Sequence, residues 1–477
     1  MKQTIIYIFM FLGIISQTSC EDQLNALPTQ SKVEGNVIVD QSSAEIALNG
    51  VYYRFASGGE SQDEPAILWA GYHELTPPML TGYFTYAFGG SPLEERFDPT
   101  DYEFSNIWSD AYSLINAANG VIEQTEALSS TLFSGNRKAE IIAEAKLMRA
   151  YGHYNLLRYF CRFDDTTSEY GALIRDEFIT TNNIAKRRSD VKSTYTFILE
   201  DLEEAIKNAP IENKNIYGNQ WIAKAMKARV LILRGEGTDY TDVVTITTDI
   251  IDNGPYELEE HVEDIFNTKG LTSKEVMLGI QPLANQTAKY DTYWYAYSSM
   301  SMYTAMSSFM SLIEDDPRKN WMLTPQKNDD DPTLTDYGIV KGISGEKKEE
   351  SIAIRLTEMY LLKAEAIVLS EGDLEDAKDL LKTVMEHAGI TDFSFIDAIT
   401  NRDELRLEIY KETIKNLIFE DGIEWTAMIR LPLEEILKIK PAIKEYNYTI
   451  LRRMNSRKTQ LLAIKIPVTV KFKTLFT

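Results

Sequence analysis

The chain has 477 residues, of which 72 are Asp or Glu and 49 are Lys or Arg, so its formal net charge at neutral pH is −23. This charge disfavours nucleic acids and anionic membrane surfaces as partners, because both are negatively charged. Neutral ligands, cations and other proteins remain possible. Apolar residues make up 44% of the chain, enough to bury one large hydrophobic core or two adjoining ones.

Residues 1–19 are typical of a secretory signal peptide. Lys2 precedes an apolar segment at 4–16, which is shorter than the about 20 residues that a membrane-spanning helix needs. Cys20 follows the small polar residues Thr18 and Ser19, which predicts a bacterial lipoprotein signal whose cysteine carries the anchoring lipid. The alternative is a free cysteine at an ordinary cleavage site. Only Cys161 would then remain unmodified, so no intramolecular disulfide is expected.

From residue 42 onward, apolar residues recur every three or four positions, which predicts helices. The clearest helices are expected at 42–56, 105–128, 134–162, 190–208, 218–235, 240–253, 351–371, 373–388 and 401–421. Pro210, Gly235 and Gly389 mark helix ends, because proline and glycine interrupt the helical backbone. Asp373 is expected to cap the helix that follows it.

Three segments, 105–162, 190–235 and 355–388, have the pattern of two helices joined by a short turn. Such pairs are typical of tetratricopeptide-like packing. Segments without this pattern separate them, at 57–104, 163–189, 254–350 and 422–477. The predicted fold is mainly α: tetratricopeptide-like helix pairs form a scaffold, with long irregular loop insertions and a few short strands, in a single domain over residues 20–477.

Two of these insertions, 57–104 and 254–350, are rich in aromatic residues. The first contains WAGYHELTPPMLTGYFTYAFGG at 69–90, and the second contains YDTYWYAYSSMSMY at 290–303 with Trp321 further on. Neither a helical nor a strand period holds through the second stretch. Because long loops on a helical scaffold often carry the function of a protein, both insertions are candidate ligand surfaces.

Signatures of catalysis are absent from the sequence. It contains no nucleophile elbow, no Walker phosphate loop and no dinucleotide-binding glycine motif. The acidic run at 327–332 lacks the glycine and the distal glutamate of a calcium loop. The many carboxylates leave a glycosidase-like acid pair open, but none stands out. We therefore expect no catalytic residue, no metal site and no cofactor.

The histidines and Cys161 have structural interpretations. None of the histidines has the spacing of metal ligands, so each is expected to be a surface or structural residue: His73, His153, His261 and His387. Cys161 lies on an apolar helix face and is expected to be a small core residue.

Several segments, in order along the chain, resemble motifs of the SusD/RagB family of nutrient-binding outer-membrane lipoproteins. They are SAEIALNGVYYRF at 43–55, AEAKLMRAYGHYNLLRYF at 143–160, RSDVKSTYTFILEDLEEAI at 188–206, WIAKAMKARVLILRG at 221–235 and IAIRLTEMYLLKAEA at 352–366. Near the C-terminus the chain departs from the family pattern, because Glu424 and Ala427 occupy the positions of a basic and an acidic residue. We expect an altered polar network there, with structural consequences only.

The resemblance implies a non-catalytic lipoprotein that captures oligosaccharides and delivers them to a SusC-type TonB-dependent transporter. Glu21 and Asp22 after the lipidated cysteine resemble a surface-export signal, which implies an outer-membrane location facing the cell exterior. Capture of peptides is an alternative within the same family. A helical-repeat interaction protein that binds no small ligand, and a secreted hydrolase, are alternatives of other classes.

In this family the ligand face is built by loops inserted between and before the helix pairs, which correspond here to the two aromatic insertions. Aromatic rings stack on the apolar faces of sugars, and polar side chains bind the hydroxyl groups. The candidate ring contacts are Trp69, Tyr72, Tyr83, Tyr86, Tyr290, Trp294, Tyr297 and Trp321. The candidate polar contacts are Asn285, Gln286, Asp291 and Arg318. The alternative for each ring is packing beneath its own loop.

Overall fold

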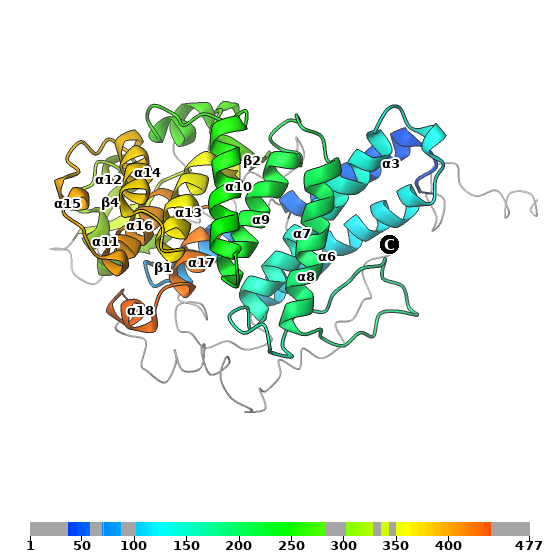
Figure 1. The fold of residues 1–477 in the computed structure, drawn as a ribbon, viewed down its shortest axis with the longest axis horizontal. Coiled ribbons are helices and arrows are strands. Elements are labelled where there is room, and N and C mark those ends of the chain that lie inside the picture. Colours follow the sequence, from blue (N-terminus) through cyan, green and yellow to red (C-terminus); the bar gives the residue numbers. More distant parts are fainter. Residues whose placement is uncertain are drawn as a thin grey trace, which may run out of the picture.

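Long helices account for most of the described chain. The computed structural model describes residues 37–57, 69, 71–86, 102–281, 302–327, 335–342 and 350–439 (Figure 1). The long helices are α3 (Gln41–Ser57), α6 (Tyr102–Glu126), α7 (Arg137–Phe160), α8 (Val191–Asn208), α9 (Gln220–Arg234), α10 (Asp239–Asn253), α13 (Leu356–Leu369), α14 (Leu374–His387) and α16 (Arg402–Leu417). The prediction of a mainly helical fold is confirmed. Within the described ranges, no helix combines the length and apolar character needed to cross a membrane.

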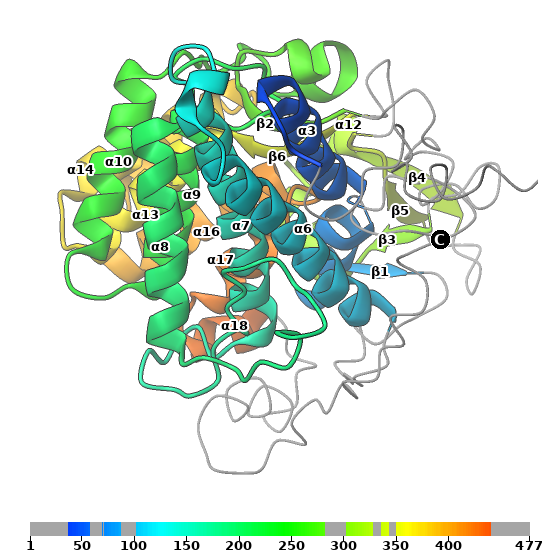
Figure 2. The same ribbon diagram turned by 90° about the vertical axis from the view of Figure 1, so that its right-hand side faces the viewer.

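The helices form a row in which each packs on the next, from α6 through α7, α8, α9, α10 and α13 to α14 (Figures 1 and 2). The predicted pairs correspond to α6 with α7, α8 with α9, and α13 with α14. Side-chain caps begin several helices: Asp190 accepts from the Ser193 amide at 2.6 Å, and Asn219 accepts from the Ile222 amide at 2.8 Å. Asp373 caps α14 as predicted, and Gly235 ends α9 with a φ of +63°.

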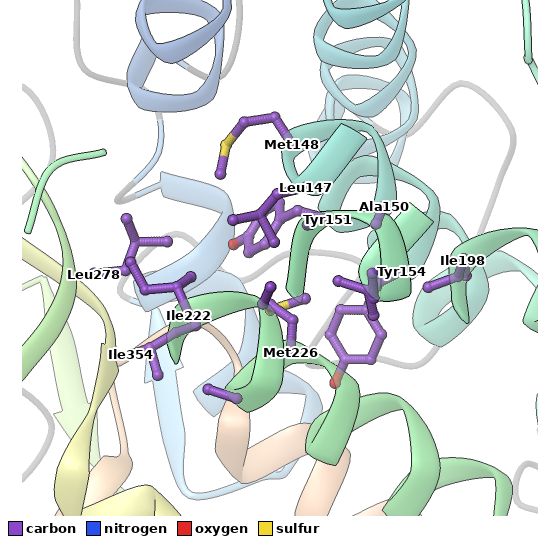
Figure 3. Packing of buried hydrophobic residues seen from close by; sticks show 14 of the residues in the cluster. Leu147, Met148, Ala150, Tyr151, Tyr154, Ile198, Ile222, Met226, Leu278 and Ile354 are labelled. Atoms are coloured by element: carbon purple, nitrogen blue, oxygen red, sulfur yellow. The ribbon is translucent and has the colours of Figure 1, made fainter. Parts of the chain in front are cut away.

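The main hydrophobic core lies between these helices and a two-stranded sheet. Figure 3 shows Leu147 and Tyr151 from α7 and Met226 from α9 close to Leu278 and Ile354 from the two strands. The strands are β2 (Val276–Ile280) and β6 (Ser351–Arg355), and they pair antiparallel. The prediction that 351–371 is helical is therefore wrong for its first five residues. Their side chains are all buried, and their backbone pairs with a strand that a local pattern cannot reveal.

A second core lies beneath a four-stranded antiparallel sheet with strand order β1-β3-β5-β4. Its strands are β1 (Phe84–Tyr86), β3 (Tyr303–Ala305), β5 (Thr335–Ile339) and β4 (Leu323–Lys327). Figure 2 shows this sheet on one side of the molecule, with α8, α10 and α14 on the other. The strands belong to the two insertions, so the insertions extend the scaffold on one side.

Short helices occur in the segments that were predicted to be irregular and in two connections between predicted helices. They are η2 (Gly71–Leu75), α4 (Thr76–Leu80), η3 (Ser130–Leu132), η4 (Ile265–Lys269), η5 (Gly270–Thr272), α11 (Ser307–Ile313), α12 (Lys319–Met322), α15 (Ser394–Asp397), α17 (Ile423–Ile429) and α18 (Leu433–Ile439). The prediction that the segment from 422 is non-helical is wrong for α17 and α18. Elements of three to seven residues show too little of the helical period to be found in a sequence, and packing stabilises them.

Candidate functional site

The two aromatic insertions meet through β1 and β3. In the register of this pair, Tyr86 lies opposite Tyr303, and their ring centroids are 4.9 Å apart with an angle of 27° between the planes. The Met306 amide donates to the Tyr83 carbonyl at 2.8 Å, which extends the pairing by one residue. The antiparallel alternation places Tyr86 and Tyr303 at a non-hydrogen-bonded position, where opposite side chains come closest. One sheet therefore unites segments more than 200 residues apart.

The two faces of this sheet differ in chemistry. Side chains alternate along each strand, and one face turns Phe84, Tyr303, Leu323 and Ile339 into the second core. Tyr86 and Tyr337 are half-buried on the same face, and the Lys319 ammonium lies 4.8 Å from the centroid of the Tyr337 ring. This face therefore places its half-buried rings at the edge of the packed core.

The opposite face is polar. Its half-buried side chains are those of Thr85, Thr304, Thr324, Gln326 and Asp336. The Gln326 amide donates to the Thr304 hydroxyl at 3.0 Å, across the sheet. Hydroxyl, amide and carboxylate groups are the partners that sugar hydroxyls need. Sequence reasoning did not select these residues, because short polar side chains show no local pattern that reveals which strand partners they will have.

Three of the residues selected from the sequence are buried in the structure. The exposed fractions are 0% for Trp69, 1% for Tyr83 and 0% for Arg318. The Trp69 ring stacks on His73 at 4.6 Å, and the Tyr83 hydroxyl lies 2.9 Å from that of Tyr410. These rings pack beneath their own insertion, which is the alternative considered for each ring. They leave no face open to a ligand, so they are not carried into the functional proposal.

Arg318 belongs to a buried ion-pair cluster. Its guanidinium donates to Asp316 at 2.6 Å and to Glu412 at 2.5 Å. Lys415 lies 2.9 Å from Glu412, on the same helix. Both carboxylates are therefore already paired, and Arg318 connects the loop before α12 to α16. Its role in this structure is to hold the scaffold together.

Two predicted ring contacts are half-buried. Tyr86 stacks on Tyr303, as described above, and Trp321 stacks on Phe266 with a centroid separation of 5.6 Å. The side chain of Tyr72 is not among the described side chains. The remaining candidates lie outside the described residues: Asn285, Gln286, Tyr290, Asp291, Trp294 and Tyr297. Cys20 also lies outside them.

A pocket between the two insertions and the scaffold is lined in part by Lys341. Its other lining residues include Phe266, Ser351 and Glu420. Burial lowers the pKa of Lys341 to about 8, although the charge of Glu420 opposes this shift. The Lys341 ammonium donates to the Asn416 carbonyl at 2.7 Å, to the Ile418 carbonyl at 2.8 Å and to the Glu420 carboxylate at 2.5 Å. Because an ammonium has three donors, none is left for an anionic ligand.

The segment around Glu424 differs from the family pattern, and the structure shows its environment. Glu424 is fully buried, and its Oε1 atom accepts from the Phe419 amide at 3.3 Å. Its Oε2 atom has no hydrogen-bond partner among the described residues. Burial raises the pKa of Glu424 well above its usual value, which favours the neutral acid. The polar network here therefore contains a buried carboxyl group without a cationic partner at hydrogen-bonding distance within the described chain.

The described part of the chain holds no cluster of three or more His, Cys, Asp or Glu side chains that could bind a metal ion. His153 is buried on α7, where its Nδ1 atom lies 2.9 Å from the Arg149 carbonyl and its Nε2 atom accepts from the Arg175 amide at 3.2 Å. Burial raises the pKa of the Cys161 thiol to about 11, so the thiol remains protonated near neutral pH.

Comparison with known families identifies the class of protein that this fold represents. Residues 86–232 match a SusD-like family model described as starch-binding and associating with the outer membrane, and residues 281–460 match a model described as the SusD family. Together these matches cover more than half of the chain. The chain belongs to the SusD family.

Solved structures agree with this assignment at the level of the fold. A SusD superfamily protein from Bacteroides thetaiotaomicron has a TM-score of 0.69 and 22% identity, covering 82% of this chain and 89% of its own. A SusD superfamily protein from Bacteroides vulgatus has a TM-score of 0.69 and 14% identity, covering 88% and 94% of the two chains. A SusD-like carbohydrate binding protein from Bacteroides vulgatus has a TM-score of 0.66 and 17% identity, covering 82% and 84%.

A curated relative matches a smaller part of the chain. A SusD-like protein from Bacteroides ovatus is 28% identical over 189 residues, which are 38% of this chain. The match spans 33% of that relative, about a third of its length.

Proposed function

We propose that the protein captures oligosaccharides on a face built by its two insertions and delivers them to a SusC-type TonB-dependent transporter, without catalysis. The observation that carries this proposal is the pairing of β1 with β3. It joins two segments far apart in the sequence in one sheet, with the half-buried ring of Tyr86 on one face and a row of polar side chains on the other. Aromatic rings stack on the apolar faces of sugars and polar side chains bind sugar hydroxyls, so each face of this sheet offers one of the two kinds of contact.

The comparisons support the choice of a carbohydrate. The matching family model is described as starch-binding and associating with the outer membrane, and a structural neighbour is described as a carbohydrate binding protein. The ligand contacts proposed for this chain are Tyr72, Tyr86, Asn285, Gln286, Tyr290, Asp291, Trp294, Tyr297 and Trp321.

The proposed location is the outer membrane, with the protein held by a lipid on Cys20 and facing the cell exterior. The signal-peptide pattern of residues 1–19 and the acidic residues Glu21 and Asp22 support this location. In this arrangement the mature chain is one domain, and the transporter is its membrane partner.

Titration calorimetry tests the ligand proposal. Soluble starch, other polysaccharides, mucin glycans and peptides are titrated into the wild-type protein and into the variants Tyr86→Ala, Trp294→Ala and Trp321→Ala. Removing an aromatic anchor is expected to weaken glycan binding about tenfold. Trp221→Ala is the matched control, because Trp221 is a half-buried tryptophan on α9 of the scaffold. Binding that is unchanged in all three variants would reject the proposed face, and binding of peptides alone would replace the ligand class.

A further inference from the structure

Tyr83 lies where the first insertion meets three other segments. Its amide donates to the Pro78 carbonyl at 3.2 Å, and its carbonyl accepts from the Met306 amide at 2.8 Å. Its hydroxyl lies 2.9 Å from the hydroxyl of Tyr410 on α16. Tyr83 therefore connects α4, the segment that follows β3, and the helical scaffold.

β1 begins directly after Tyr83 and has little support of its own. It has three residues, from Phe84 to Tyr86, and within the described residues it lies at the edge of the sheet and pairs with β3 alone. Ordering the backbone costs conformational entropy, and a three-residue edge strand forms few ladder hydrogen bonds to offset that cost. Contacts on either side of β1 must therefore contribute to holding it in register.

The apolar contacts near β1 are extensive but weakly directional. The Phe84 ring lies 4.9 Å from the Phe309 ring and 4.7 Å from the Phe419 ring, measured between centroids. Such packing tolerates small shifts, whereas a hydrogen bond prefers a narrow range of distance and angle. The bond between Tyr83 and Tyr410 is buried on both sides, and α16 packs against α13 of the scaffold. The hydrogen bond between Tyr83 and Tyr410 is thus a directional link between the start of β1 and the helical scaffold.

We propose that Tyr83 and Tyr410 form a positioning pair that fixes β1 in register with β3 and so holds the ring of Tyr86 on Tyr303. Tyr83 is then a positioning residue, not the ligand contact that its place in the aromatic insertion suggested. The consequence for ligand capture rests on the proposed function. The geometry of the sheet does not depend on it.

A disulfide between the strands measures this positioning without a ligand. Thr85 and Thr304 are opposite each other in the register, on the polar face. They occupy a hydrogen-bonded position, where Cα atoms are about 5.5 Å apart, within the range that a disulfide spans. The variant Thr85→Cys/Thr304→Cys is made in the full chain with Cys20→Ala and Cys161→Ala, which leaves no other cysteine. The equilibrium between this disulfide and oxidised glutathione gives the effective concentration of one cysteine thiol at the other. A high effective concentration means that the two strands are held in register.

Three changes are compared in this background: Tyr83→Phe, Tyr410→Phe and both together. Each single change is expected to lower the effective concentration about tenfold, equivalent to about 1.4 kcal/mol, because a buried hydrogen bond is lost and the remaining hydroxyl is left unpaired. The double variant removes both hydroxyls, so its unfolding free energy should recover relative to the single variants. Its effective concentration should stay low, because the directional link is still missing.

Tyr195→Phe is the matched control, since Tyr195 is also buried but its hydroxyl donates to the Phe163 carbonyl at 2.9 Å, and its helix α8 lies on the other side of the molecule from the strands (Figure 2). It should leave the effective concentration within about twofold of the parent protein. The proposal is overturned if the single variants leave the effective concentration unchanged, or if it recovers together with stability in the double variant. Either result would reduce the pair to a packing contact.

Starch affinity, measured on the same proteins, separates this inference from the proposed function. Tyr83→Phe should weaken binding in the reduced protein, and closing the 85–304 disulfide should restore it. If the wild-type protein binds no glycan while the effective concentration still falls in Tyr83→Phe, the proposed ligand is wrong and the positioning pair stands. If closing the disulfide fails to restore the affinity of a protein that binds starch, the link between positioning and capture is rejected.

Discussion

The Nη1 atom of Arg229 lies 2.6 Å from the Oδ2 atom of Asp421, and neither side chain is exposed to solvent. Arg229 also donates to both carboxylate oxygens of Glu358, at 2.6 Å each. Asp421 has a φ of +42°, a backbone conformation that a residue other than glycine adopts only when its surroundings hold it. The buried ion pairs hold this loop between α9 and α13.

The other oxygen of Asp421 connects the same loop to the first insertion. Its Oδ1 atom lies 2.8 Å from the Nδ1 atom of His73 and 3.0 Å from the Nη2 atom of Arg158. Burial lowers the pKa of His73 more than the nearby carboxylate raises it, so the neutral ring, with its proton on Nδ1, donates to Asp421. One aspartate thus joins α7, α9 and the insertion that carries β1.

Replacing Asp421 by asparagine should destabilise the protein by about 3–5 kcal/mol, because it removes the carboxylate that compensates Arg158 and one of the two carboxylates that Arg229 contacts. Urea denaturation followed by circular dichroism measures the change in unfolding free energy. Glu257→Gln is the control, since Glu257 pairs with Lys274 on the surface, where an ion pair contributes less than about 1 kcal/mol. Similar values for the two variants would contradict the assigned role of Asp421.

The pKa of Asp421 determines how the destabilisation caused by Asp421→Asn depends on pH. Burial alone would raise that pKa, but the charges of Arg158 and Arg229 outweigh burial and lower it well below its usual range. A carboxylate with a lowered pKa contributes stability above its unfolded pKa of about 3.9, and the contribution is lost as the pH falls below that value. The difference between wild type and Asp421→Asn should therefore be constant between about pH 5 and pH 8.

Glu424→Gln should show the opposite behaviour. Burial raises the pKa of Glu424 above its unfolded value of 4.5, so the stability of the wild-type protein falls as the pH rises above that value. The amide has no such dependence, so the melting temperature of the variant should rise relative to wild type from pH 5 to pH 8. Thermal unfolding of both proteins at several pH values measures the difference. A difference that does not change with pH would rule out a buried neutral carboxyl.

Gly422→Ala should destabilise the protein more than Gly237→Ala. Both glycines have positive φ angles, of +65° and +56°, which cost an alanine about 1–2 kcal/mol. A Cβ atom on Gly422 would lie 2.7 Å from the Tyr159 hydroxyl and 3.0 Å from Pro77 Cγ, whereas Gly237 has no atom within 4 Å of that position. Overpacking should add about 1–3 kcal/mol at Gly422. Equal unfolding free energies in urea would show that the packing beside Gly422 is loose.

Cys20→Ala should release the protein from the membrane fraction, because the acyl chains on the cysteine are its proposed anchor. Fractionation of cells that express each form, followed by immunoblotting, measures the distribution. Cys161→Ala is the control, since this half-buried cysteine is not expected to be lipidated. A Cys20→Ala protein that still sediments with membranes would reject the lipid anchor.

Part of the fold is readable in the sequence, because helical period and capping are local properties. Apolar spacing within single segments predicts the positions of α3, α6 to α10, α14 and α16. Asp373 predicts the start of α14, because an aspartate commonly caps the first turn of a helix. Ser351–Arg355 does not follow from such spacing, since its partner strand begins at Val276. The helical interpretation of this segment was wrong because strand pairing is a long-range property.

The candidate site also has features that the sequence predicts and features that only the structure shows. The sequence by itself determined the helical scaffold, the family resemblance and the two aromatic insertions, because each depends on residues close together along the chain. Only the tertiary structure decided that Trp69, Tyr83 and Arg318 are buried and that Tyr86 lies on Tyr303. An aromatic or charged side chain has the same local pattern whether it faces solvent or core, and contacts between residues hundreds of positions apart select one of the two.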